Sequence, residues 1–282
     1  MIYSLRQNYK LSELLEIAHL ARSTYYDRLY RNARPDKYAK IKDCIKKVFR
    51  NSNETYGYRR MHIMLKKNGY TISPNTVRRL MRELSLGPLM YSRHTSGYHS
   101  YKGHIGTINR NLLNQKFTAT APFTVLHTDI TQVRLANHSW GYISVVMDGA
   151  SREIITAVIS EHANLKQLAS TIDNLAVKLP INSKPILHSD QGWQYQHSLY
   201  QNAIKKLGIT PSMSRRGSCH DNAPMESFFN LMKRECLYRT TIDNLDDLKR
   251  IVTEYIAWYN NQRISINKNG LTPVEFREQA IV

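Results

Sequence analysis

Three carboxylates in the second half of the chain combine unusual positions with residue types suited to metal chemistry. Asp129 falls inside a run of strand-forming residues, where a charge is costly. Asp190 directly follows an apolar run, and Glu226 lies in the first turns of a helix predicted to start near Pro224, with Asp221 or Asn222 as its cap. Such groups can converge on one or two Mg²⁺ ions, which take oxygen ligands and promote in-line displacement at phosphorus. Each acid alone has an ordinary explanation as a turn, loop or helix-start residue, but the set of three predicts phosphoryl transfer.

The helix that carries Glu226 also carries a cation seven residues later. Its apolar stripe in "DNAPMESFFNLMKREC" consists of Met225, Phe228, Phe229 and Met232. Lys233 lies on roughly the same side as Glu226, because seven residues turn an α-helix through nearly two full turns. We therefore expect Lys233 to contact the substrate beside the reacting bond. A structural ion pair with Asp221 or Glu235 is the alternative.

The elements that must position these residues alternate between strands and helices. "FTVLHTDITQVRL", "WGYISVVMDG" and "EIITAVIS" are β-rich runs in close succession, typical of an antiparallel meander. A helix over about 164–178 precedes the apolar run "KPILHSD", and a helix over "HSLYQNAIKKLG" precedes "ITPSM". The pattern predicts a mixed α/β sheet with helices on its faces. Two further helices are expected, one starting near Pro224 and one over "NLDDLKRIVTEYIAWYNNQR".

The first part of the chain is predicted to be all-α and to contain two helix-turn-helix-like regions. Apolar residues recur at helical spacing in "LSELLEIAHL", and Ser23 or Thr24 can cap a second helix. A third helix is expected over "YAKIKDCIKKVFR". In the second region, Gly69 ends one helix and "SP" starts another, which carries Arg78, Arg79 and Arg82 on its outer face. An ordinary helical hairpin with a solvated basic face remains the alternative.

The charge distribution indicates which part of the chain binds an anionic partner. The net charge is +18; residues 1–116 hold 23 Lys and Arg against 7 Asp and Glu, whereas residues 117–282 hold 17 against 15. Clustered cations gain affinity for nucleic acid by releasing counterions from phosphates, so the front is predicted to bind DNA. No apolar run is long enough to span a membrane, no signal peptide is evident, and the three cysteines form no C-x-x-C pair. We expect a cytoplasmic protein.

The spacing of the three acids resembles a known arrangement. Asp129 precedes Asp190 by 61 positions, and 35 residues separate Asp190 from Glu226. This resembles the D, D-35-E pattern of retroviral integrases and bacterial transposases. "HTDIT", "HSDQGWQY", "CHDNAPMESFFNLMKRE" and "YNNQRISINKNGLTPVEF" look like signatures of insertion-sequence transposases of the two-reading-frame type, specifically the second-frame product. "RSTYY" and "YGYRRMHIML" extend the resemblance to nearly the whole chain. Leu126 stands where the family usually has Trp.

The resemblance implies an RNase H-like catalytic core preceded by an all-α helix-turn-helix DNA-binding region. It implies Asp129, Asp190 and Glu226 as catalytic metal ligands for Mg²⁺, with Mn²⁺ as a substitute, and Lys233, Arg78, Arg79 and Arg82 as DNA-binding residues. The expected domains are helical regions at 1–50 and 51–90, a basic linker at 91–120, the core at 121–240 and a C-terminal helix and tail at 241–282. The implied enzyme is a transposase that cuts element ends and joins them to target DNA.

The implied partners are DNA, further copies of the chain on that DNA, and an upstream-frame protein, which can also be fused to this chain. The implied location is the bacterial cytoplasm, in association with the nucleoid. No membrane partner is expected. Two rival functions stay open. One is a DNA-binding regulator without catalysis, and the other is a stand-alone nuclease of the same fold.

Overall fold

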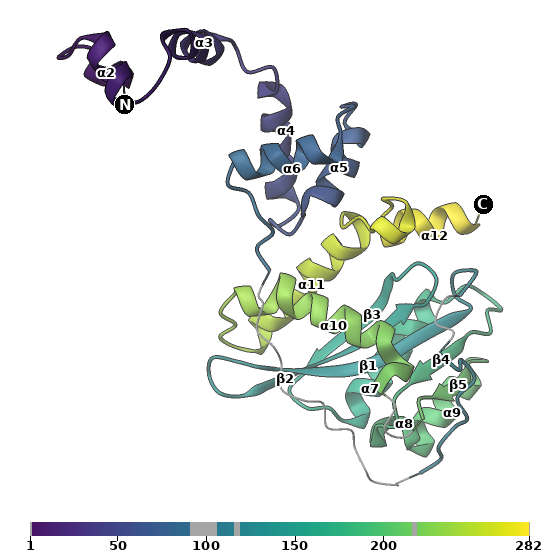
Figure 1. Ribbon diagram of the computed structural model, residues 1–282. Coiled ribbons are helices and arrows are strands. Elements are labelled where there is room, and N and C mark those ends of the chain that lie inside the picture. Colours follow the sequence, from purple (N-terminus) through teal and green to yellow (C-terminus); the bar gives the residue numbers. More distant parts are fainter. Residues whose placement is uncertain (1, 91–105, 116–118, 216–218, 282) are drawn as a thin grey trace. The chain divides into compact units, whose positions relative to one another are not determined.

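The computed structural model covers the chain and describes residues 2–90, 106–115, 119–215 and 219–281 (Figure 1). The chain divides into two compact units, Met1–Lys47 and Val48–Val282. The first unit contains α1 (Ile2–Leu5), α2 (Leu11–Ile17), α3 (Arg22–Ala33) and most of α4 (Ala39–Asn51), which continues into the second unit. The helices expected over "LSELLEIAHL" and "YAKIKDCIKKVFR" are confirmed.

The start of α3 differs from the sequence prediction. Its N-cap is Ala21, and no side chain caps the helix. Ser23 and Thr24 already lie inside the first turn, whereas a capping hydroxyl must precede the first helical residue to reach the free amides beyond it. The prediction of a Ser23 or Thr24 cap is therefore wrong.

The helical part of the second unit confirms the predicted helix ends. Helix α5 (Tyr58–Lys67) is followed by Gly69, whose φ of +83° lies in the left-handed region that favours glycine. Helix α6 (Pro74–Glu83) starts after Ser73, whose side chain accepts a hydrogen bond from the Thr76 backbone N–H at 3.2 Å. A Pro in the first turn and a capping serine thus begin the helix as predicted.

A five-stranded mixed sheet forms the centre of the second unit, in the order β3-β2-β1-β4-β5. The strands β1 (Val125–Arg134), β2 (Trp140–Asp148) and β3 (Ile154–Ser160) are antiparallel, which confirms the predicted meander. The strands β4 (Ile186–Ser189) and β5 (Thr210–Met213) run parallel to β1, because each follows a helical crossover.

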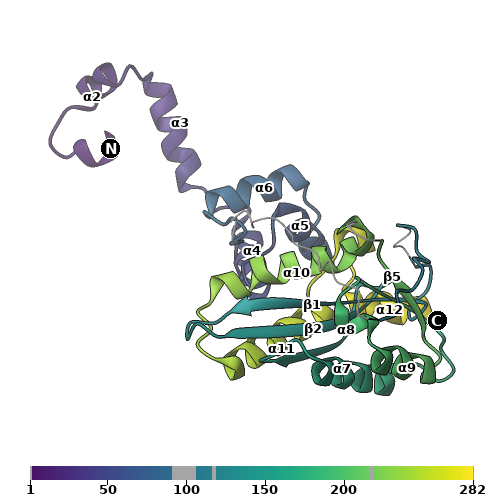
Figure 2. The same ribbon diagram turned by 90° about the horizontal axis from the view of Figure 1, so that it is seen from below.

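Helices cover both faces of this sheet (Figures 1 and 2). Successive side chains of β2 point alternately to the two faces, and both sets are buried under helices. Ile143 and Val145 pack with α10 (Ala223–Glu235) and α11 (Leu245–Asn261), while Val146 packs with α7 (Leu165–Lys178) and α9 (Ser198–Lys206). A strand buried on both sides has no polar face, which explains why "YISVVMD" is almost continuously apolar. Each face has its own core.

The remaining elements are short or lie at the end of the chain. They are α8 (Trp193–Gln196), the 3₁₀ turns η1 (Cys219–Asn222), η2 (Leu237–Arg239) and η3 (Ile266–Lys268), and α12 (Pro273–Ile281). Residues 106–115 lie against the sheet domain, because the Thr107 N–H donates to the Gln196 carbonyl at 3.1 Å and the Leu112 N–H donates to Ser212 Oγ at 3.0 Å. None of the described helices has the length and apolar character needed to cross a membrane.

Candidate active site

The two aspartates come from neighbouring parallel strands. The ladder between β1 and β4 pairs His127 with His188. Asp129 follows His127 by two residues within β1, so it points to the same face of the sheet as His127. Asp190 follows His188 by two residues and lies directly after the end of β4. Asp129 pairs across β1 and β2 with Val145, whose side chain packs toward α10 and α11. Asp129 therefore lies on the α10 face, and Asp190 is close enough to raise the pKa of Asp129.

Local hydrogen bonds orient both carboxylates. Asp129 Oδ1 accepts from the Ile130 N–H at 2.7 Å, and Asp190 Oδ1 accepts from the Gly192 N–H at 2.9 Å. A Cβ at position 192 would lie 3.0 Å from Asp190 Oδ1, a contact that would press on the carboxylate. Glycine at this position therefore leaves room for the Asp190 side chain in the turn after β4.

Helix α10 brings Glu226 and Lys233 to the same place. It packs against β1, with its predicted stripe of Met225, Phe228, Phe229 and Met232 buried. Glu226 and Lys233 are half-buried at the edge of this stripe. The helical position predicted for the two residues is confirmed, because the apolar stripe fixes the rotation of the helix about its axis.

The electrostatics show that the four side chains share one neighbourhood. Burial raises the pKa of Asp129 well above its usual range, and the negative charges of Asp190 and Glu226 raise it further. The Ile130 N–H and Lys233 oppose this shift. Burial also raises the pKa of Asp190. Burial lowers the pKa of Lys233, whereas the negative charge of Asp129 raises it. Repulsion among acids beside one amine favours an added cation.

The donor set fits a hard divalent cation, since carboxylate oxygens are the ligands that Mg²⁺ prefers. The three acids affect one another's charge, but they do not form a complete metal-coordination sphere. Among the described residues, no three His, Cys, Asp or Glu side chains are grouped closely enough to hold a metal ion. A cation held between the carboxylates would offset their mutual repulsion, which adds to the effect of burial on the pKa of Asp129.

A buried histidine pair under the aspartates was not predicted. His127 and His188 lie edge to face, with 5.9 Å between ring centroids. Burial lowers the pKa of His127 to about 3 and that of His188 to about 4, so both rings are neutral. His188 shares hydrogen bonds with Ser212 at 2.9 Å and Ser214 at 3.2 Å. The signal was present in the sequence, because "HTD" and "HSD" place a histidine two residues before each acid.

Asp221 is a buried carboxylate that the sequence suggested as a helix cap. It instead accepts from Arg215 Nε and NH2, each at 3.0 Å, and from Asn111 and Gln115 side chains at 2.9 and 3.0 Å. The Arg215 guanidinium lowers the pKa of the Asp221 carboxyl far below its usual range. Asn222 occupies the N-cap position of α10 without a capping side-chain bond. Of the two predicted caps, Asn222 holds the N-cap position, whereas Asp221 does not cap the helix because it pairs with the charged Arg215 and with two amide side chains from a distant segment.

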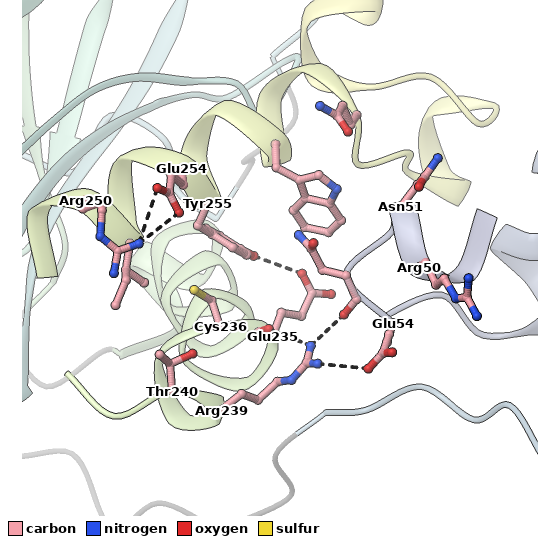
Figure 3. A pocket seen from close by; sticks show the side chains of 14 residues that line it. Arg50, Asn51, Glu54, Glu235, Cys236, Arg239, Thr240, Arg250, Glu254 and Tyr255 are labelled. Carbon is pink, nitrogen blue, oxygen red and sulfur yellow. Dashed lines mark hydrogen bonds and ion pairs between the residues drawn. The ribbon is translucent and has the colours of Figure 1, made fainter. Parts of the chain in front are cut away.

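A buried ion pair holds the far end of α10. Glu235, whose side chain is fully buried, accepts from Arg263 Nε and Nη2, both at 2.8 Å. It also accepts from the Tyr255 hydroxyl at 3.0 Å (Figure 3). Arg60 Nη1, from α5, lies 3.8 Å from Glu235 Oε1. The helix that carries Glu226 is therefore tied to α11 and its C-terminal extension, and it lies near α5.

An asparagine joins α11 to the sheet. Asn260 Oδ1 accepts from the Ile154 N–H at 2.9 Å, and Asn260 Nδ2 donates to the Ile154 carbonyl at 2.9 Å. This pairing imitates a neighbouring strand at the start of edge strand β3. Asn260 and Arg263 both belong to "YNNQR", so this motif connects the sheet to the helix bearing Glu226.

The arginines predicted to bind DNA lie on α6, on the face opposite its buried residues Val77, Leu80 and Met81. Arg78, Arg79 and Arg82 are all exposed. Arg78 lies over the Tyr58 ring, 5.8 Å from its centroid, and Arg79 forms an ion pair with Glu83. They are far from α10 in the sequence and lie on the exposed face of α6.

Comparison with known proteins decides the family. Two models described as "Integrase core domain" match residues 119–219 and 226–281, and one described as "HTH-like domain" matches residues 36–93. The putative transposase InsK of insertion sequence IS150 from Escherichia coli K12 is 40% identical over 279 residues, covering 99% of this chain and 97% of that protein. The chain belongs to the insertion-sequence transposases with an integrase core.

A second transposase relative agrees with this family. The transposase InsF of IS3A from Escherichia coli K12 is 31% identical, covering 96% of this chain and 95% of that protein. The solved catalytic core domain of HTLV-2 integrase in complex with magnesium matches 56% of this chain and 98% of that chain at 15% identity, with a TM-score of 0.43. The family matches confirm the resemblance, the RNase H-like α/β core with its helix-turn-helix-like region, and the transposase function.

Proposed function

We propose that this transposase cuts DNA at the ends of its insertion sequence and joins those ends to target DNA, with Asp129, Asp190 and Glu226 as metal ligands. The observation that carries the proposal is the placement of Asp129 and Asp190 after paired positions of parallel strands, with the α10 edge bearing Glu226 beside them. Sites of α/β sheets form beside strand ends such as the end of β4, which Asp190 directly follows.

The chemistry would consist of two in-line displacements at phosphorus. Water attacks a phosphodiester at the element end, and the P–O bond to the 3′ oxygen breaks to free a 3′-hydroxyl. That hydroxyl then attacks a target phosphodiester, so one P–O bond forms and one breaks, without a covalent protein intermediate. Bound Mg²⁺, or Mn²⁺ in its place, would supply positive charge for the attacking and leaving oxygens. Lys233 would contact the DNA beside the reacting bond.

The helical front would hold the DNA while the core reacts. The exposed side chains of Arg78, Arg79 and Arg82 support a role in binding phosphates or bases, and residues 1–116 carry nearly all of the excess positive charge. We further propose the division into helical regions at 1–50 and 51–90, a linker at 91–120, a core at 121–240 and a tail at 241–282. The working form would be an oligomer on DNA in the cytoplasm, alone or joined to an upstream-frame protein.

The decisive experiment is strand transfer with Asp190→Asn, which keeps the size of the side chain and removes a ligand charge. With oligonucleotides that bear the element ends and with Mg²⁺, we expect cleavage and joining to be lost and DNA binding to persist. The matched control is Asp173→Asn, the same change at an exposed acid of α7, whose helix covers the other face of the sheet. Normal joining by Asp190→Asn would refute the metal assignment.

The same assay separates the two rival functions. A regulator without catalysis would bind the ends and leave them uncut, and a stand-alone nuclease would cut without joining. The wild-type chain is expected to do both.

A further inference from the structure

Helix α10 has a second edge that lines a cavity, on the flank away from Glu226 and Lys233. Glu226 and Lys233 occupy one edge, whereas Ala223, Ser227 and Leu231 follow each other at four-residue spacing on the other. These three residues line a cavity of about 350 Å³. Its remaining lining includes Arg152, from the turn between β2 and β3.

The backbone of Arg152 is held in place by this turn. The Arg152 N–H donates to the Asp148 carbonyl at 3.0 Å, and the Asp148 N–H donates to the Glu153 carbonyl at 2.8 Å. Arg152 lines the cavity together with apolar side chains that include Phe228 and Tyr259. The cation is therefore presented from a fixed position and not from a long mobile loop.

The Arg152 guanidinium has no ion pair or hydrogen bond within residues 2–90, 106–115, 119–215 and 219–281. Burial lowers its pKa, against the weaker favourable effects of Tyr259 and Asp148. Half-buried arginines are normally paired, since losing water without a partner is costly. An arginine that has lost part of its hydration without gaining a partner is suited to an external anion.

Asp148 is the nearby acid, but its oxygens are engaged elsewhere. Oδ1 accepts from the Ser151 N–H at 2.7 Å and the Ser151 hydroxyl at 2.8 Å, and Oδ2 accepts from the Phe123 N–H at 2.7 Å. Asp148 is also fully buried. Its carboxylate stabilises the turn and leaves the Arg152 guanidinium available.

A second cation adds to the positive field. Lys268 donates to the Ala150 carbonyl, and its pKa is lowered by burial and then by the charge of Arg152. Ser227 and Asn267, both exposed, line the cavity and can donate neutral hydrogen bonds. Two cations that repel each other beside neutral donors match the chemistry of a phosphate.

We propose that the Arg152 cavity binds a phosphate of the DNA backbone, on the flank of α10 opposite its catalytic edge. A helix with side chains is about 10 Å wide. Along the duplex axis one strand advances by about 3.4 Å per nucleotide, so this width corresponds to about three nucleotides between the bound phosphate and the reacting one. Arg152 would thus help to fix the register of the DNA across α10.

The test measures DNA binding by the full chain with Arg152→Gln across a series of salt concentrations. Losing one phosphate contact should reduce the slope of log affinity against log salt by about 0.9 and weaken binding about fivefold at 0.15 M salt. Arg152→Lys should retain part of the affinity. The matched control is Arg250→Gln, the same change at an exposed arginine of α11 that is already paired with Asp247 and Glu254. Its slope should stay at the wild-type value.

Two results would overturn the proposal. An unchanged salt slope with a lowered melting temperature would make Arg152 purely structural. Stabilisation of the wild type by inorganic phosphate, lost in Arg152→Gln while DNA binding is unchanged, would assign the cavity to free phosphate. The inference rests on the proposed function in taking DNA as its ligand, but binding does not require catalysis. Failure of Asp190→Asn to block joining would leave the Arg152 result interpretable.

Discussion

The buried ion pair between Glu235 and Arg263 allows a prediction with a worked magnitude. In Arg263→Met the stem of the side chain is kept and the charge is removed, so Glu235 remains fully buried with the Tyr255 hydroxyl and with Arg60 at 3.8 Å. Breaking a buried pair by removing one partner costs about 3–5 kcal/mol, because a buried charge is left uncompensated. Arg60 offsets part of this loss, so we expect about 3 kcal/mol.

A loss of this size is easily measured. For a domain of 150–250 residues, each kcal/mol lowers Tm by about 2–4 °C, so Arg263→Met should melt about 6–12 °C below wild type. The assay is thermal unfolding followed by circular dichroism. The control variant Arg250→Met removes an exposed arginine from α11 and should shift Tm by less than about 2 °C.

The double variant Glu235→Leu/Arg263→Met tests the mechanism behind the number. Replacing both charges by apolar side chains leaves no buried ion from the pair, so the double variant should be more stable than Arg263→Met alone. An Arg263→Met variant within about 1 kcal/mol of wild type, or a double variant that loses the sum of both single losses, would refute the reasoning.

Three further outcomes are expected. Lys233→Ala should lower strand transfer while Tm stays within about 2 °C of wild type, and Lys233→Arg should partly restore joining; a large fall in Tm with normal joining would contradict this. Replacing Arg78, Arg79 and Arg82 together by Gln should weaken DNA binding and reduce the salt slope by about 2–3, with unchanged helix content by circular dichroism. In metal-free protein at neutral pH, Asp129→Asn should raise stability by about 0.5–2 kcal/mol. The pKa of Asp129 is higher in the folded state than in the unfolded state, so its ionised carboxylate destabilises the fold at neutral pH. As the pH falls through the folded-state pKa, Asp129 becomes protonated and the stability gain of Asp129→Asn should vanish. A stability gain at pH 3 equal to that at neutral pH would contradict this prediction.

Much of the site could be predicted because it depends on local pattern. Apolar periodicity gives the inner face of a helix or strand, and this was enough to place Glu226 and Lys233 at the edge of the α10 stripe. The position of Asp129 inside a strand and of Asp190 at the end of the next central strand also follows from short runs of sequence. These features need only the geometry of one element at a time.

Polar partners across elements could not be predicted in the same way. The sequence suggested Asp221 or Glu235 as the structural partner of Lys233, but Asp221 binds Arg215 and Glu235 binds Arg263. The favourable field on Lys233 comes from Asp129. A charge has no periodicity, so its partner depends on which segments the fold brings together.

The sequence by itself therefore determined the elements, the faces they bury, the family to which the chain belongs and the three acids with their spacing. Only the tertiary structure decided that Asn260 pairs with the backbone of β3, that Arg263 holds the end of α10 through Glu235, and that Arg152 lines a cavity on its flank. The physical reason is the distance along the sequence between the residues that interact. Burial patterns arise from neighbours three or four residues apart, whereas the Glu235–Arg263 and Ile154–Asn260 contacts join residues separated by 28 and 106 positions, whose proximity is set by how the sheet and helices pack together.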